Sequence, residues 1–217
     1  MKLQLTLALI CVLLPKALTL ECNQCIPGLT GTCTDTQTNC TDQCSSATLL
    51  VSAAGVEQTV SIKGCAAAAE CVNGSLNLGV MKMTMNTQCC TTDRCNSQIP
   101  AVLPFGSLNG KKCYTCTDND CRGNVSCEGD QDHCVSATAI VSGIRVVAKG
   151  CVSGSLCTAA ASTMQAAGIT GSVSCCEGDL CNGSEEAKAT VWPNGAEGVK
   201  LSLLIMLVPL ILSTLFI

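Results

Sequence analysis

The pattern of apolar and polar positions divides the chain into two apolar ends and a long middle. Leu3–Leu14 is a nearly continuous apolar run that follows the positive Lys2, and it leads to small residues up to Thr19. The run is shorter than the roughly 20 residues of a membrane-spanning helix. This combination is typical of a secretory signal peptide, so residues 1–19 are expected to be removed. A buried N-terminal helix is the alternative.

The C-terminal apolar run, Leu201–Ile217, has the pattern of a glycosylphosphatidylinositol (GPI) anchor signal. A triplet of small residues beginning at Asn194 and the short polar spacer Glu197–Lys200 precede it, and no basic residue follows it. We expect the lipid at Asn194 and removal of residues 195–217. The protein would then lie in the outer leaflet, on the extracellular face of the plasma membrane. Asn182 is an alternative attachment site, and a single membrane-spanning helix is the alternative to an anchor.

In the middle of the chain, apolar and polar positions alternate over short segments, which predicts β-strands. We expect two hairpins: Ser46–Ser52 with Val56–Ile62 around a turn at 53–55, and Ser136–Val141 with Ile144–Ala148 around a turn at 142–143. Their spacing, with turn residues between β-branched runs, indicates an all-β fold.

A further strand is expected at Val80–Gln88, where the alternation is regular. It places Met81, Met83 and Met85 on one face and Lys82, Thr84 and Asn86 on the other. We expect the methionines to face the core, and an adaptable binding face is the alternative.

Cysteines compensate for a shortage of large apolar side chains. Aromatic residues make up only 2% of the chain, too few for a fold held by burial alone. Of the 21 cysteines, Cys11 lies in the expected signal peptide and the other 20 form two sets of ten. The first set is Cys22, Cys25, Cys33, Cys40, Cys44, Cys65, Cys71, Cys89, Cys90 and Cys95; the second is Cys113, Cys116, Cys121, Cys127, Cys134, Cys151, Cys157, Cys175, Cys176 and Cys181.

The two sets indicate a duplicated module with a period of roughly 90 residues. Both begin with Cys-x-x-Cys and end with Cys-Cys-x4-Cys-Asn. Even sets in an exported chain predict disulfides without a free thiol, although spacing alone does not give the pairing. Zinc is the competing interpretation, but His133 is the single histidine and ten cysteines fit no four-ligand site. No metal or cofactor is therefore expected.

These end motifs resemble the Ly-6/urokinase-receptor family of three-finger proteins. The resemblance is carried by Leu20-Glu-Cys22-x-x-Cys25 and Cys89-Cys90-x4-Cys95-Asn96, and again by Cys113-x-x-Cys116 and Cys175-Cys176-x4-Cys181-Asn182. It implies two tandem three-finger (snake-toxin-like) domains in a small, disulfide-rich, all-β fold. We place these domains at residues 20–98 and 111–184. The resemblance also implies that Asn96 and Asn182 tie each C-terminal segment to the first strand of its domain.

The resemblance implies a disulfide pairing as well. In the first domain the pairs are Cys22–Cys44, Cys25–Cys33, Cys40–Cys65, Cys71–Cys89 and Cys90–Cys95. In the second they are Cys113–Cys134, Cys116–Cys121, Cys127–Cys151, Cys157–Cys175 and Cys176–Cys181. Every bridge stays within one domain, so we expect each domain to fold alone.

Two cysteine-free segments flank the second domain. Residues 99–110, with two prolines and two glycines, are expected to be the interdomain linker, and residues 185–194 a stalk to the anchor. Four Asn-x-Ser/Thr sequons are candidates for N-glycosylation: Asn39, Asn73, Asn124 and Asn182.

No catalytic arrangement emerges from the sequence, so we do not expect an enzyme. His133 has no free thiol to activate and is interpreted as a surface histidine. An acidic cluster is interpreted as a solvated face or as a surface that steers a basic partner; it comprises Asp118, Asp120, Glu128, Asp130 and Asp132. The net charge of −4 argues against nucleic acid as a partner.

The resemblance implies a receptor or adhesion protein that binds an extracellular protein through its finger loops. The alternative is a soluble inhibitor of a secreted enzyme, similar to the gamma-type phospholipase inhibitors. Membrane anchorage distinguishes the two, because those inhibitors circulate.

Overall fold

The computed structural model describes residues 19–27, 34–117, 120–141, 144–166 and 170–183. Within them lie eleven strands, three short 3-10 turns and one long helix, which confirms the expected strand-rich, disulfide-rich fold. The expected anchor site, stalk and C-terminal propeptide, and nearly all of the signal peptide, lie outside the described residues.

The elements are β1 Leu20–Gln24, β2 Thr36–Cys40, β3 Gln43–Ala53, β4 Val56–Ala66, η1 Ala68–Glu70, β5 Gly74–Asn77, β6 Met81–Cys90, η2 Cys95–Ser97, β7 Leu108–Thr117, β8 Asp120–Glu128, β9 His133–Val141, β10 Ile144–Val152, α2 Gly154–Ala166, β11 Gly171–Glu177 and η3 Cys181–Gly183.

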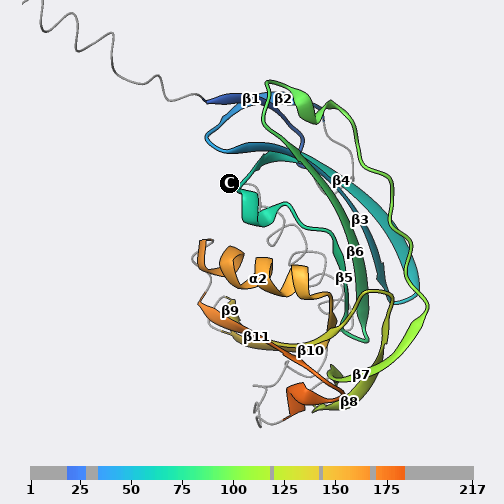
Figure 1. Ribbon diagram of the computed structural model, residues 1–217. Helices are drawn as coiled ribbons and strands as arrows, with labels where there is room; N and C mark the ends of the chain where they lie inside the picture. Colours follow the sequence, from blue (N-terminus) through green and yellow to red (C-terminus); the bar gives the residue numbers. More distant parts are fainter. Residues whose placement is uncertain (1–18, 28–33, 118–119, 142–143, 167–169, 184–217) are drawn as a thin grey trace, which may run out of the picture.

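One antiparallel sheet of seven strands runs through both domains, in the order β11-β9-β10-β5-β6-β3-β4. Strand β5 of the first domain pairs with β10 of the second through Leu76 opposite Val152 and Asn77 opposite Cys151. The sheet curves into an arch, and α2 lies on its concave side (Figure 1). Two small hairpins, β1-β2 and β7-β8, form separate two-stranded sheets.

The first expected hairpin is confirmed as β3 and β4. Ala53 pairs with Val56, so the turn consists of only two residues, Ala54 and Gly55. Both have positive φ, 51° and 79°, which suits the right-handed twist of the flanking strands. The second expected hairpin is present as β9 and β10, but its turn at 142–143 lies outside the described residues.

The expected strand with three methionines is β6, and its two faces differ as predicted. Met85 is buried in the main apolar cluster and Met83 packs against it. On the opposite face, Thr84 and Asn86 donate hydrogen bonds to backbone carbonyls of the segment between the domains. The core interpretation of the methionines is therefore confirmed for Met83 and Met85.

The segment between the domains lies along the face of the sheet that points away from α2. We call residues 99–107 the strap, since β7 begins at Leu108. The Thr48 hydroxyl donates to the carbonyl of Pro100 at 2.7 Å, and the Asn86 amide donates to that of Ala101 at 2.8 Å. The Lys82 ammonium lies 4.3 Å from the ring centroid of Phe105. These contacts fix the strap on β3 and β6.

Two equal cysteine intervals fold differently in the two domains. Between Cys71 and Cys89 the chain forms β5 and β6, whereas between Cys157 and Cys175 it forms most of α2 and then β11. The helix is a departure from the all-β expectation. Its alanine-rich sequence has a high helix propensity, and Leu156 and Ala159 are buried on one face of it.

Nine disulfides lie within the described residues, and they have the pairing that the family resemblance implies. They are Cys22–Cys44, Cys40–Cys65, Cys71–Cys89, Cys90–Cys95, Cys113–Cys134, Cys116–Cys121, Cys127–Cys151, Cys157–Cys175 and Cys176–Cys181. The tenth expected bridge involves Cys33, which lies outside the described residues. The bridges form the centre of one small core at the base of each domain.

The main apolar cluster belongs to both domains together. The first domain contributes Ala47, Leu49, Ile62 and Met85, and the second contributes Val135, Val152 and Leu156. A domain expressed alone would expose its half of this cluster and one free strand edge, either β5 or β10. The shared core therefore argues against the expectation, based on the bridges alone, that each domain folds by itself.

Candidate interaction surface

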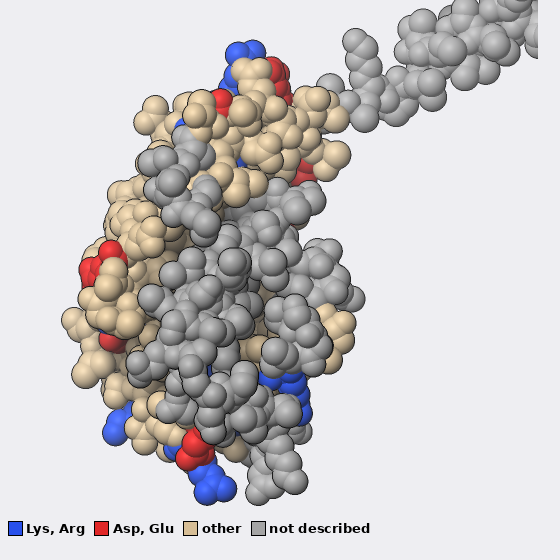
Figure 2. All heavy atoms as spheres, turned by 180° about the vertical axis from the view of Figure 1, so that it is seen from behind, with Lys and Arg blue, Asp and Glu red and all other residues tan. Residues whose placement is uncertain are grey.

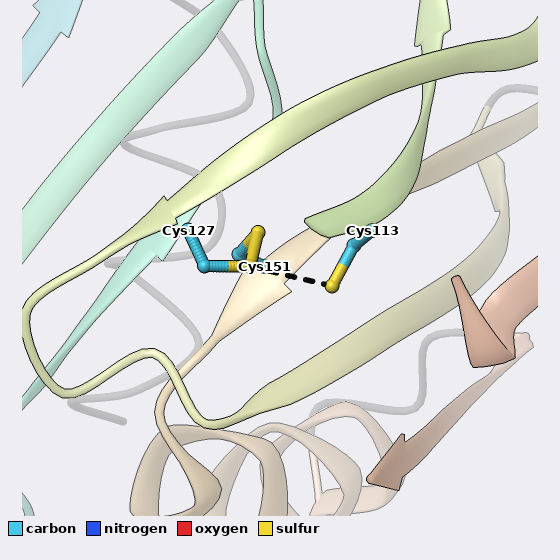
Figure 3. A group of neighbouring side chains, drawn as sticks. All are labelled: Cys113, Cys127 and Cys151. Atoms are coloured by element: carbon cyan, nitrogen blue, oxygen red, sulfur yellow. Dashed lines mark hydrogen bonds between the residues drawn. A yellow bond between two sulfur atoms is a disulfide. The ribbon is translucent and has the colours of Figure 1, made fainter. Parts of the chain in front are cut away.

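Three cysteines in the described part of the chain are close enough together to suggest a metal site, but they belong to two disulfides. The sulfur atoms of Cys113, Cys127 and Cys151 lie within 4.8 Å of one another in the buried base of the second domain (Figure 3). Cys127 is bonded to Cys151, and Cys113 is bonded to Cys134. Metal ions bind the thiolate form of cysteine, which these bridged sulfurs cannot adopt. The group is structural.

His133 is better partnered than its interpretation as a surface histidine suggests. Its Nδ1 lies 2.8 Å from Asp132 Oδ1, and its Nε2 lies 3.4 Å from Glu177 Oε1. The imidazole thus lies between the start of β9 and the end of β11, with only 23% of its side chain exposed. It has a positioning role in the sheet.

Three carboxylates of the acidic cluster in the second domain have partners within the molecule. Glu128 forms an ion pair with Lys82 of the first domain at 3.3 Å, and Asp130 accepts a 2.6 Å hydrogen bond from the Ser75 hydroxyl, also of the first domain. Asp132 accepts a bond from the backbone N–H of Gly154, at the start of α2. Asp130 and Asp132 are exposed, as a solvated face implies, with 58% of the Asp132 side chain in solvent. These three carboxylates are nevertheless not free, because they also join the two domains and the helix. Asp120 is exposed, and Asp118 lies outside the described residues.

The contacts of Asp132 predict an acid-sensitive component of stability. The hydrogen bond with His133 lowers the pKa of Asp132 below its ordinary value of 3.8, and the Gly154 N–H acts in the same direction. Because the pKa is lower in the folded state, the stabilisation is present above the unfolded value and is lost as the pH falls through the folded value. We expect Asp132→Asn to flatten the decline in unfolding free energy below about pH 4.

Urea unfolding between pH 2 and pH 6 measures this effect. Asp120→Asn is the matched control, because Asp120 lies at an exposed position with 70% of its side chain in solvent. An acid decline that is the same in Asp132→Asn and the parent protein would contradict the assignment.

Two asparagines close the bases of the domains in the same way. Asn96 accepts from the N–H of Asn23 and donates to the carbonyls of Asn23 and Ser45. Asn182 accepts from the N–H of Tyr114 and donates to the carbonyls of Tyr114 and Val135. The C-terminal segments are thus tied to β1 and β7, as the resemblance implies.

These bonds bear on the candidate glycosylation sites. Asn182 is only 8% exposed and its amide donates two hydrogen bonds, so a glycan on that nitrogen is incompatible with the observed contacts. Asn39, Asn73 and Asn124 all lie at exposed positions and stay candidates.

Charge does not single out a binding surface. Figure 2 shows the described lysine, arginine, aspartate and glutamate atoms scattered over a mainly uncharged face. Exposed apolar side chains are more informative, because burial of apolar area drives most protein association. Those that stand out most on the turns of the first domain are Val56, 70% exposed, and Val80, 51% exposed.

The two turns that carry these valines lie side by side. Ala53, at the end of β3, pairs with Met81, at the start of β6. The second turn is held by a 2.8 Å bond from the N–H of Leu78 to the carbonyl of Met81, with Gly79 at φ 80°. We call residues 54–56 and 79–80 the fingertip surface. It presents two apolar side chains on turns fixed by the sheet, an arrangement suited to binding a protein.

Comparisons with known proteins agree with this architecture. The u-PAR/Ly-6 domain family matches residues 18–98, and the snake toxin and toxin-like protein family matches residues 111–182. The chain belongs to the Ly-6/uPAR family. Membership supports a cell-surface or extracellular binding role in general, and domains of this kind are generally non-enzymatic.

Two relatives of this Ly-6/uPAR chain are similar over about two thirds of it. It is 30% identical over 166 residues to Ly6/PLAUR domain-containing protein 3 of Rattus norvegicus, covering 65% of this chain and 47% of the relative. It is 29% identical over 166 residues to the protein of the same name from Mus musculus, covering 65% of this chain and 45% of the relative. The chain thus spans about half the length of the curated relatives that it matches.

The described residues include no helix that is both long and apolar enough to cross a bilayer.

Proposed function

We propose that this protein is a GPI-anchored receptor-like protein that binds an extracellular protein through the fingertip surface of its first domain. The observation that carries the proposal is the pair of exposed valines, Val56 and Val80, on two adjacent turns. Apolar side chains held in solvent by a rigid scaffold are typical anchors of protein interfaces.

The surroundings of the fingertip surface favour a protein ligand over a small molecule. The turn residues 54–56 project from the end of a long hairpin, and Glu57 and Gln58 beside them are exposed and polar. An apolar centre with a polar rim is the usual anatomy of a protein interface. Because the turns are held by β3 and β6, little conformational entropy is lost on binding.

The anchor part of the proposal rests on the sequence alone. The small triplet at Asn194, the polar spacer and the apolar tail after Lys200 form the signal. Anchorage would hold the fingertip surface outside the cell, where the disulfides are stable.

One experiment on cells that display the full chain tests both parts. After surface cross-linking, phosphatidylinositol-specific phospholipase C should release the protein together with its bound partner. We expect Val80→Asp to reduce partner recovery about tenfold or more, because a charge replaces an apolar anchor. Val102→Asp is the matched control, since Val102 is 42% exposed on the strap, outside the fingertip surface.

The outcomes separate the two parts of the proposal. Equal partner recovery with Val80→Asp and Val102→Asp would exclude the fingertip surface. Resistance to the lipase with normal surface display would favour a membrane-spanning helix, and quantitative secretion without lipase would favour a soluble inhibitor.

A further inference from the structure

Within the residues that the structure describes, strand β4 has no strand paired to one side of its outer half. It is the terminal strand of the seven-stranded sheet, beyond β3. The N–H and carbonyl of Lys63 point away from β3, because they exchange bonds of 3.0 and 2.9 Å with Cys25. In an antiparallel strand alternate residues point to the same side, so the backbone groups of Glu57, Thr59 and Ser61 also face outward.

These outward groups are available for pairing. Among the residues that the structure describes, Cys25 is the only one that pairs with the outer side of β4, at Lys63. The first four residues of β4, Val56 to Thr59, are all exposed. The sequence from Val56 to Ile62 contains no proline and no lysine, and Glu57 is its single charge. Natural edge strands usually carry prolines or charges, lysine above all, that prevent pairing; of these, Val56–Ile62 has only Glu57.

We propose that a second copy of this chain pairs with β4, antiparallel, about a two-fold axis at Gln58. Glu57 of one copy then exchanges backbone hydrogen bonds with Thr59 of the other, twice by symmetry. On the face that carries Ile62 in the core, Val56 of each copy packs against Val60 of the other. The dimer covers a valine that is 70% exposed in the single chain.

Three features of the edge favour a second copy as its occupant. Glu57 is the only charge on this segment, and it lies opposite Thr59 of the second copy and not opposite the second Glu57. The register therefore places no like charges opposite each other. Cys25 closes the edge at Lys63, which leaves room for a short strand only. A second copy meets this limit. Its own β4 begins at Val56, and the turn at residues 54–55 leads the chain back to its own β3, so it would not extend along the edge as far as Lys63.

The test is self-association of the full chain, displayed on cells in two differently tagged forms and measured by co-precipitation after surface cross-linking. Thr59→Pro removes an outward N–H without removing a bond to β3, and we expect it to reduce self-association about tenfold by the loss of two symmetry-related hydrogen bonds. Thr59→Val is the matched control that keeps this N–H, and it should pair normally. Surface amount and mobility on a non-reducing gel report correct folding.

A second pair of variants tests the position of the two-fold axis. Gln58→Lys places two lysines opposite each other and should weaken self-association several-fold, whereas Thr59→Lys places lysine opposite Glu57 and should not weaken it. Both substitutions add one positive charge to each chain, so a non-specific effect of charge would change self-association equally in the two variants.

The proposal is overturned if the parent chain does not self-associate, or if its self-association is insensitive to both Thr59→Pro and Gln58→Lys. A monomeric parent chain whose partner capture is lost in Thr59→Pro would assign the edge to a strand of another protein, and would also overturn the dimer. The dimer would cover Val56, which also belongs to the fingertip surface, so one copy could not use that valine for both contacts. All four variants keep Val56 and Val80, and self-association is measured separately from partner recovery, so either proposal can fail while the other stands.

Discussion

Replacement of Asn182 with alanine is expected to destabilise the second domain by roughly 2–4 kcal/mol, because three backbone groups lose their partner at once. The Asn182 carbonyl oxygen accepts from Tyr114 N–H at 2.9 Å, and its amide donates to the carbonyls of Tyr114 and Val135 at 3.0 and 2.8 Å. The side chain is 8% exposed, so water cannot readily replace these bonds. The expected loss is large for a domain with a small apolar core.

Chemical unfolding of the full chain measures this loss, and two variants control for the sequon. Asn124→Ala removes an exposed asparagine that also belongs to a sequon, and should change the unfolding free energy by less than about 0.5 kcal/mol. Ser184→Ala removes the Asn182 sequon but keeps the asparagine, and should behave like the parent chain. If Ser184→Ala is as unstable as Asn182→Ala, the effect comes from a glycan and the clamp has no energetic role.

The elements near the disulfides were the ones that the sequence predicted well. Spacing and end motifs indicate the duplicated module, and the resemblance implies each bridge that the described residues contain. The β3–β4 hairpin follows from alternation and from Gly55, because a local turn fixes the pairing of its neighbours. These features depend on residues that are close in sequence or covalently bonded.

The junction between the domains was not predictable from these patterns. Strand β5 has only four residues, Gly74–Asn77, too few for a periodic signal. Its pairing with β10 joins segments about 75 residues apart, and nothing in the local pattern of either strand specifies that contact. The acidic cluster shows the same limit, since Glu128 and Asp130 are partnered by Lys82 and Ser75 of the other domain.

The helix was missed for a different reason. The interval Cys157–Cys175, which contains most of the helix, is equal in length to Cys71–Cys89, and this repeat spacing gives no indication of a helix. The available signal was local: alanines at 159–161 raise helix propensity, whereas the first domain has Gly79, Val80 and Thr84 in its corresponding interval. Equal spacing between two bridged cysteines fixes only where the ends of the intervening segment lie. The residues between them decide whether that segment forms a helix or strands.

The junction itself can be tested at Gly150, where β10 passes close to the backbone of Asn77 and Leu78. A Cβ atom at this position would collide with the backbone carbonyl oxygen of Asn77 and lie 2.9 Å from the Cα of Leu78. Neither obstacle is a flexible side chain, so Gly150→Ala can be accommodated only by separating the strands. Only two residue pairs join β5 to β10, Leu76 with Val152 and Asn77 with Cys151. A small shift therefore disturbs both of these pairs and the neighbouring bond from Ser153 N–H to the Ser75 carbonyl.

We expect Gly150→Ala to lower the unfolding free energy by about 2–3 kcal/mol and to open the arch, because the shared apolar cluster divides when β5 and β10 separate. Urea unfolding measures the first effect, and small-angle scattering with limited proteolysis of the strap measures the second. Gly123→Ala in β8 is the matched control: its Cβ would lie 3.4 Å from Thr115 Cγ2, an ordinary contact, and its stability should change by less than about 0.5 kcal/mol. If Gly150→Ala scatters and resists protease like the control, the two domains are held together by contacts other than the β5–β10 pair, and the continuous sheet is not what makes them one unit.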